Sequence, residues 1–283
     1  MGTGFDAKNL STKVLETIFC TCKNLKHLDI PRGPYDLAKI PLKKWMNFQN
    51  LEYLGIFCNE MPDVANTIVN YCKNLKHLEI KSFFMMDTRL EIDECIIEPA
   101  VDGGPFSSRS VLHKLSKLQY LEHLCLCTIL ELEDSTIIAV ANNCKYLKSL
   151  DIQACYDITE TALAALTNLE NLEKLVVSFL DIITDSFLIK LKGLKEFHCE
   201  QCDKITDAGI IQFIKNNPDL EILNVYSADN ITINMIIAAD QATENRTNGI
   251  ILHINVDKRL MKRVYNSNKS IITSQWLVVD KLY

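Results

Sequence analysis

The sequence lacks the long apolar runs of membrane proteins, because none of its hydrophobic stretches approaches the roughly 18–20 residues that span a bilayer. It also lacks the apolar core of a secretory signal in its polar first ten residues, MGTGFDAKNL. The chain also has no net positive charge, because its 30 basic residues are outnumbered by 36 acidic ones and the net charge is −6. These absences predict a protein that binds neither a membrane nor nucleic acid.

Catalytic motifs are absent too. The sequence has no glycine-rich phosphate-binding loop and no serine or cysteine in a nucleophile-elbow context. It has no second C-x-x-C pair that would complete a four-ligand zinc site. The prediction is therefore a non-enzymatic protein without a cofactor or a metal.

Cysteine, in contrast, is abundant. The chain has 11 cysteines, an odd number, and no secretory signal. This combination favours free thiols in a reducing compartment over a disulfide framework. We therefore expect the protein in the cytoplasm, or in the nucleus.

A repeated frame organises the chain. The pattern Leu-x-x-Leu-x-Leu/Ile starts at Leu25, Leu51, Leu75, Leu121, Leu147, Leu172, Leu194 and Leu220, with a weaker copy at Ile251. Most spacings lie within the range of about 20–29 residues that is typical of leucine-rich repeats. The apolar positions three and five residues after the first Leu alternate with polar ones, which predicts a short strand with one buried face.

A helix is predicted after each strand. The position twelve residues after the first Leu holds Asp63, Asp87, Thr159, Thr184, Thr206 or Thr232. Side-chain oxygens of such residues accept a backbone N–H at a helix N-terminus, and the preceding residue is mostly apolar, from Pro62 and Met86 to Ile231. Helical runs are expected over 64–69, 162–166, 187–191 and 208–214.

Stacking explains why the unit repeats, because one strand and one helix cannot bury their own apolar faces. The predicted fold is an α/β leucine-rich-repeat solenoid. It is a right-handed horseshoe with parallel strands on the concave face and helices on the convex face.

The cysteines mostly follow the same frame. Cys22, Cys72 and Cys144 precede a first Leu by three residues, and Cys155 and Cys202 follow one by eight. Buried structural thiols explain this placement. The alternative is a metal site at Cys199-x-x-Cys202, with help from Cys20-x-Cys22 or Cys125-x-Cys127, but the repeat frame places each of these residues better.

Two of the repeats carry a family resemblance. The segments Cys155-Tyr-Asp-Ile-Thr-Glu and Cys202-Asp-Lys-Ile-Thr-Asp, with Asn142-Asn-Cys144-Lys-Tyr-Leu147, resemble the cysteine-containing repeats of F-box/LRR proteins over roughly residues 10–256. The resemblance implies a horseshoe that holds a protein substrate, and an F-box that docks on the Skp1 adaptor of a cullin–RING (SCF-type) ubiquitin ligase.

No F-box is recognisable in this chain, because only 24 residues precede Leu25. The stretch 10–22 fits the helix and pre-strand slots of a leading repeat. Skp1 and cullin are therefore expected only if an F-box exists outside this chain. The alternative is an F-box-free scaffold or adaptor without a link to ubiquitin.

The ends and one insertion depart from the frame. Residues 1–24 are expected to form an N-terminal capping helix or partial repeat, residues 25–256 about nine repeats, and residues 257–283 a C-terminal cap that includes Trp276. An acidic insertion at 87–109 carries six acidic residues against two basic ones. It is either disordered or a lip that prefers a basic partner.

The concave face is the expected binding surface, because solenoids bind along their extended concavity. Its outward positions predict a partner-binding set of His27, Asp29, Tyr53, Phe57, His77, Glu79, His123, Asp151, Lys174, Glu196, His198 and Tyr226. Aromatic side chains of this kind are enriched at interface hot spots. The alternative is that the histidines are solvated and idle. We expect a monomer that binds a protein substrate or partner.

Overall fold

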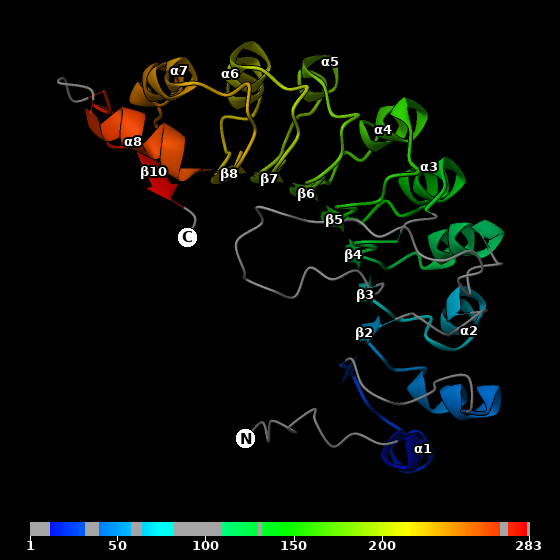
Figure 1. The fold of residues 1–283 in the computed structure, drawn as a ribbon. Helices are drawn as coiled ribbons and strands as arrows, with labels where there is room; N and C mark the ends of the chain where they lie inside the picture. The colour runs from blue at the N-terminus through cyan, green and yellow to red at the C-terminus, as the bar shows by residue number, and fades with distance from the viewer. Residues whose placement is uncertain are drawn as a thin grey trace.

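The computed structural model describes residues 12–31, 40–57, 64–81, 109–129, 132–266 and 271–281. Within these residues, ten strands pair in chain order as one parallel sheet. They are β1 (His27–Ile30), β2 (Tyr53–Phe57), β3 (His77–Lys81), β4 (His123–Cys125), β5 (Ser149–Asp151), β6 (Lys174–Val176), β7 (Glu196–His198), β8 (Ile222–Asn224), β9 (Leu252–Val256) and β10 (Leu277–Lys281). The sheet curves, and the strands line the inside of the arc (Figure 1).

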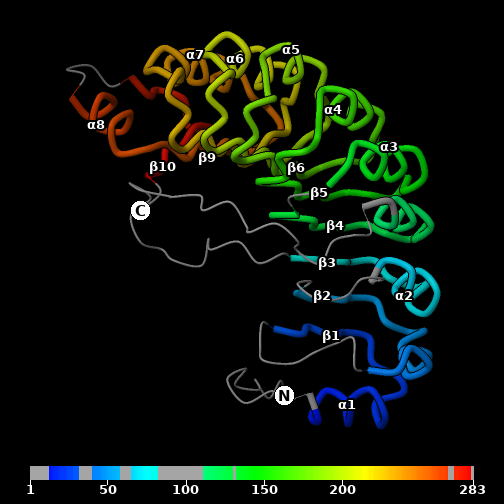
Figure 2. The backbone as a smooth tube through the Cα atoms, turned by 45° about the vertical axis from the view of Figure 1, so that its right-hand side comes forward, coloured from blue at the N-terminus to red at the C-terminus, as the bar shows by residue number. Residues whose placement is uncertain are grey.

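The helices stand outside the sheet, with α1 before β1 and one helix between each strand and the next (Figure 2). They are α1 (Thr12–Thr21), the 3₁₀ helix η3 (Leu42–Phe48), α2 (Val64–Tyr71), the 3₁₀ helix η4 (Arg109–Lys117), α3 (Asp134–Asn143), α4 (Glu160–Leu166), α5 (Asp185–Leu188), α6 (Asp207–Asn216), α7 (Ile233–Glu244) and α8 (Lys258–Asn266). This arrangement confirms the predicted α/β leucine-rich-repeat solenoid.

One row of side chains runs through the whole core. The register aligns Leu28 with Leu54, Leu54 with Leu78, and so on to Ile254. The members are at most 7% exposed: Leu28, Leu54, Leu78, Leu124, Leu150, Leu175, Phe197, Leu223 and Ile254. Burying each such side chain contributes roughly 1.5–3 kcal/mol. The repeat frame read from the sequence is therefore the register of the sheet.

The predicted threonine caps occupy their helix N-termini, and two of them make the expected cap hydrogen bond. Thr159 accepts an N–H from Thr161, and Thr232 accepts one from Asn234. Among the described residues, Thr206 accepts none at its cap. Its hydroxyl donates to Asp185 Oδ2 of the preceding repeat at 2.6 Å.

This contact between repeats recurs, and we call it the Asp–Thr ladder. In each rung, a threonine donates its backbone N–H and its hydroxyl to the two oxygens of an aspartate from the preceding helix. The rungs are Asp134–Thr159, Asp185–Thr206, Asp207–Thr232 and Asp240–Thr273. At Glu160 the sequence changes, and the hydroxyl of Thr184 bonds to Ser186 instead. The ladder therefore links each of these repeats to the next.

Helix lengths differ modestly from the expectation. The short repeat around α5 gives a helix of four residues, not the five expected at 187–191. The helix between β3 and β4, η4, is a 3₁₀ helix. The predicted caps Asp63 and Asp87, the residues before them and the acidic insertion except Arg109 lie outside the described residues.

The buried cysteines stabilise contacts between repeats. The nine cysteines of the described part are all free thiols. Cys155 donates to the Leu126 carbonyl at 3.0 Å, and Cys202 to the Val177 carbonyl at 3.4 Å. Burial raises the pKa of Cys202 to about 12. Cys199 bonds to yet another carbonyl, that of Asn224, so the two residues of the C-x-x-C spacing serve separate backbone contacts.

Candidate binding surface on the concave face

Four ring side chains stack across neighbouring strands of the concave face. Ring centroids lie 4.0 Å apart for His27 and Tyr53, 4.6 Å for Tyr53 and His77, and 5.0 Å for His77 and His123. The spacing follows from the sheet, because paired strands lie about 4.8 Å apart and the register places these residues opposite one another. We call these four residues the aromatic column.

Glu79 anchors the aromatic column from the next outward position of β3. Its carboxylate accepts from His77 Nε2 at 2.9 Å and from Lys81 Nζ at 2.7 Å. Burial opposes the charge on Glu79, but the hydrogen bonds from Lys81 and His77 outweigh it and lower the pKa. Burial beside the sheet, and the neighbouring His77, also lower the pKa of His123. The column therefore places its rings beside a carboxylate that two hydrogen bonds hold in place.

Charged pairs continue the surface toward the C-terminus. Lys174 on β6 contacts Glu196 on β7 at 2.7 Å. His198 lies 3.7 Å from the same carboxylate, and burial and then Lys174 lower its pKa. Pairs this exposed contribute up to about 1 kcal/mol each, so their value lies in presenting alternating charge.

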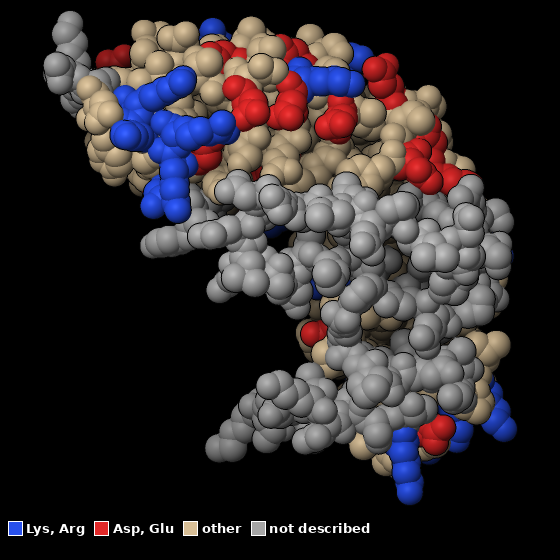
Figure 3. Space-filling model, viewed as in Figure 1, with Lys and Arg blue, Asp and Glu red and all other residues tan. Residues whose placement is uncertain are grey.

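A hollow of about 600 Å³ lies over the middle strands. It is lined by residues of the aromatic column, such as His77, and by the charged residues beyond it as far as Glu221. Outside it, Figure 3 shows basic side chains gathered at the C-terminal end of the array, where α8 lies. The four basic residues of this helix are exposed, and Arg259 pairs with Asp229 and Asp257.

The structure brings most of the predicted binding residues together. His27, Tyr53, His77, Glu79 and His123 form one group, and Lys174, Glu196 and His198 form a second, with Asp151 between them. Asp29 lies beside Gly55. A Cβ added to Gly55 would lie 2.5 Å from the carboxylate of Asp29. Phe57 ends β2, and Tyr226 follows β8 near the other end of the array, away from the aromatic column.

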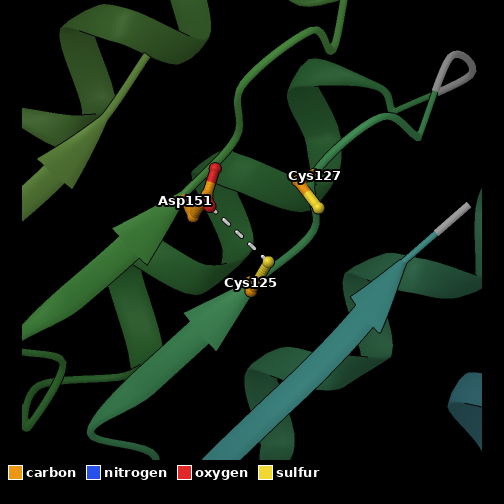
Figure 4. Close-up of side chains that lie close together, drawn as sticks. All are labelled: Cys125, Cys127 and Asp151. Atoms are coloured by element: carbon orange, nitrogen blue, oxygen red, sulfur yellow. Dashed lines mark hydrogen bonds between the residues drawn. The ribbon is translucent and has the colours of Figure 1, made fainter. Parts of the chain in front are cut away.

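The residues of the hollow that were absent from the predicted set include two cysteines. Cys125 and Cys127 flank the buried Leu126, so both thiols lie on the concave side, and Asp151 of β5 stands opposite Cys125. Figure 4 shows the three side chains converging, with the hydrogen bond from Cys125 Sγ to Asp151 Oδ2 dashed at 3.7 Å. The period-two spacing of Cys-Leu-Cys in an outward column is the signal that identifies them.

The two thiols influence each other. Donation from Cys125 lowers the pKa of Cys127, and the same contact, with burial, raises the pKa of Cys125. Burial raises the pKa of Asp151. Of these two thiols, Cys127 is therefore the first to ionise.

Comparison with known proteins gives one partial relative. No protein-family model matches the sequence. An 86-residue segment is 34% identical to the "Antagonist of mitotic exit network protein 1" of Saccharomyces cerevisiae (strain ATCC 204508 / S288c). That segment covers 29% of this chain and 16% of the yeast protein.

Solved structures extend the comparison to nearly the whole chain. A chain of the Rad7 and Elc1 complex in yeast matches 95% of this chain and 77% of its own length, with a TM-score of 0.51 and 15% identity. An internalin C2 from Listeria monocytogenes str. 4b F2365 covers 83% of each chain at a TM-score of 0.48 and 16% identity. The fold is that of a leucine-rich-repeat protein. Within the described residues, no helix combines the length and the apolar character needed to cross a membrane.

Proposed function

We propose that this protein is a non-enzymatic interaction module that binds another protein through its concave face. The observation that carries the proposal is the aromatic column, which lies beside a hollow lined by alternating charges. Stacked rings offer contact area at a low cost in side-chain entropy, and the paired charges around them give orientation. The partner fits as a protein segment with its own aromatic and charged side chains.

Substrate recognition by an SCF-type ubiquitin ligase is the more specific form of the proposal. It is supported by the resemblance of the repeats around Cys155 and Cys202 to those of F-box/LRR proteins. The Rad7 and Elc1 complex supports the general idea, since a protein of this fold is found there with a bound partner. Skp1 and cullin enter only through an F-box outside this chain. The second candidate, a scaffold unrelated to ubiquitin, rests on the same surface.

Site-specific photo-crosslinking tests the surface directly. A photo-reactive phenylalanine replaces Tyr53 in the aromatic column, and in a control chain it replaces Tyr265, which is 79% exposed on α8. We expect a specific crosslinked protein from position 53 that is missing from position 265. Equal crosslinking from both positions, or crosslinking from position 265 alone, would refute binding by the concave face.

The identity of the crosslinked complex separates the two forms of the proposal. Under native conditions, co-purification of Skp1 in stoichiometric amount with the captured complex supports the ligase form. A specific partner without Skp1 supports the scaffold. Tyr53→Ser should then lower the affinity between this chain and its purified partner at least tenfold, which corresponds to the loss of one hot-spot residue.

A further inference from the structure

The thiols of Cys125 and Cys127 and the carboxylate of Asp151 form the one group of three potential metal ligands in the part of the chain that the structure describes. Their donor atoms all lie within 4.8 Å of one another. The distance of 3.7 Å from Cys125 Sγ to Asp151 Oδ2 is already close to that in a zinc site. With bonds of about 2.3 Å to sulfur and about 2.0 Å to oxygen, tetrahedral geometry places the two atoms about 3.5 Å apart.

The backbone around the three residues is fixed by the sheet. Leu126 N donates to the Asp151 carbonyl at 2.8 Å, and Thr128 N donates to the Gln153 carbonyl at 2.9 Å. These bonds bracket Cys127 on both sides. Binding a metal therefore requires only small side-chain rotations, and little backbone entropy is lost.

The carboxylate is oriented by a second contact. The backbone N–H of Gln153 donates to Asp151 Oδ1 at 3.0 Å, which leaves Oδ2 aimed at the thiols. Outer contacts of this kind orient the ligands of zinc sites. Cys127 is 8% exposed, so the site is shielded on one side, and all three residues line the hollow on the other.

We propose that Cys125, Cys127 and Asp151 bind one Zn²⁺ ion, with the fourth coordination position directed into the concave hollow. Two thiolates with one carboxylate match the donor preference of zinc, and three protein ligands leave the open position typical of non-structural sites. Two thiolates and a carboxylate carry one negative charge more than Zn²⁺ neutralises. Lys81 lines the same hollow, and its charge, although paired with Glu79, also acts on Cys127 and Asp151 and offsets part of this excess.

Other cysteines of the described chain are less suited to binding a metal than Cys125 and Cys127. Cys155, Cys199 and Cys202 are fully buried, and their thiols already donate to backbone carbonyls. Cys20 is exposed on α1 without comparable neighbours among the described residues. Cys20→Ser is therefore a matched control for the loss of an exposed thiol.

The test uses the full chain, reduced and freed of metal, and titrates it with Zn²⁺ in competition with a chromophoric chelator. We expect one equivalent bound at submicromolar dissociation constant. Cys125→Ser and Cys127→Ser should each weaken binding at least 100-fold, and Asp151→Asn at least tenfold, while Cys20→Ser leaves the affinity unchanged. Co²⁺ in place of Zn²⁺ should give a thiolate-to-cobalt charge-transfer band that either cysteine substitution removes.

Circular dichroism of each variant confirms that the solenoid still folds, and Asp151→Asn preserves the size of the side chain if a cysteine variant does not fold. Stoichiometric binding that persists in the Cys125→Ser/Cys127→Ser double variant would overturn the proposal. So would the absence of a bound equivalent in the wild-type chain, or an unchanged affinity in Asp151→Asn.

Discussion

Gly209 gives a sharp test of the Asp–Thr ladder, because the expected sign runs against helix propensity. Gly209 is the third residue of α6 and is buried. Replacing glycine by alanine inside a helix ordinarily stabilises it by about 1 kcal/mol. Here a Cβ would lie 2.0 Å from Asp185 Oδ1 and 2.4 Å from its Cγ, distances that no real contact allows.

The carboxylate of Asp185 must therefore move, and two hydrogen bonds are lost. They run from Thr206 N at 2.8 Å and from Thr206 Oγ1 at 2.6 Å. A hydrogen bond to a charged group contributes about 1.5–3 kcal/mol, and the lower figure applies because Thr206 is exposed. The loss of about 3 kcal/mol exceeds the propensity gain, so Gly209→Ala should destabilise the chain by about 2 kcal/mol.

Urea denaturation of four chains measures this balance as a double-mutant cycle. Gly209→Ala is made in the wild-type chain and in Asp185→Ala, where the obstructing carboxylate is gone. In the second background the same substitution should stabilise by about 1 kcal/mol. If Gly209→Ala stabilises the wild-type chain, or if its effect is equal in both backgrounds, the reasoning is refuted.

Three further outcomes are expected. Glu160→Asp should restore the missing rung with Thr184 and raise the free energy of unfolding by about 1 kcal/mol, measured by thermal denaturation. No change would show that the start of α5 lies too far from position 160 to form the rung. Because burial lowers the pKa of His198 in the folded chain, the unfolded chain binds more protons below its ordinary pKa of about 6.5. Stability should therefore fall as the pH drops through that range, and less so in His198→Gln; equal pH profiles would contradict this. Leu150→Ala, in the fully buried row, should cost about 3–4 kcal/mol in urea denaturation, and a cost below 1 kcal/mol would refute a continuous core.

The sequence predicts the core because its signal is local. Leu150 and its equivalents stand at fixed distances within each repeat, so alternation alone identifies the buried face. The threonine caps, such as Thr206, follow from the same count. The same frame also predicts the strand register, because equivalent positions of stacked repeats pair with one another.

The partners of those threonines were not predictable in the same way. Asp185 lies 21 residues before Thr206, whereas Asp134 and Asp207 lie 25 residues before their threonines. The spacing depends on the length of each helix, and only the three-dimensional stacking shows that the carboxylate reaches the next cap. Gly209 is understandable only with that contact in view, since the short repeat brings Asp185 against α6.

The concave surface shows the same division between local and nonlocal information. The outward columns were readable from the frame, and with them the residues of the aromatic column. Their stacking was not readable, because it depends on side-chain rotamers. The sequence indicates Cys125-x-Cys127 only as help for a metal site at Cys199 and Cys202, because Asp151, which lies beside it, belongs to another strand.

The register of the repeats brings equivalent residues of neighbouring strands into columns. The two proposals for the concave face depend on different columns and are therefore independent. Equivalent positions lie about 4.8 Å apart, so one new side chain always meets the same column of the next repeat. His123 belongs to the aromatic column and Cys125 to the three-ligand cluster, although both lie on β4. Tyr53→Ser should therefore weaken the partner without changing the zinc affinity, whereas Asp151→Asn should weaken zinc binding and leave the stacked rings intact. If Tyr53→Ser also abolished zinc binding, the substitution would have disturbed the sheet itself, and neither proposal would be supported by its loss of function.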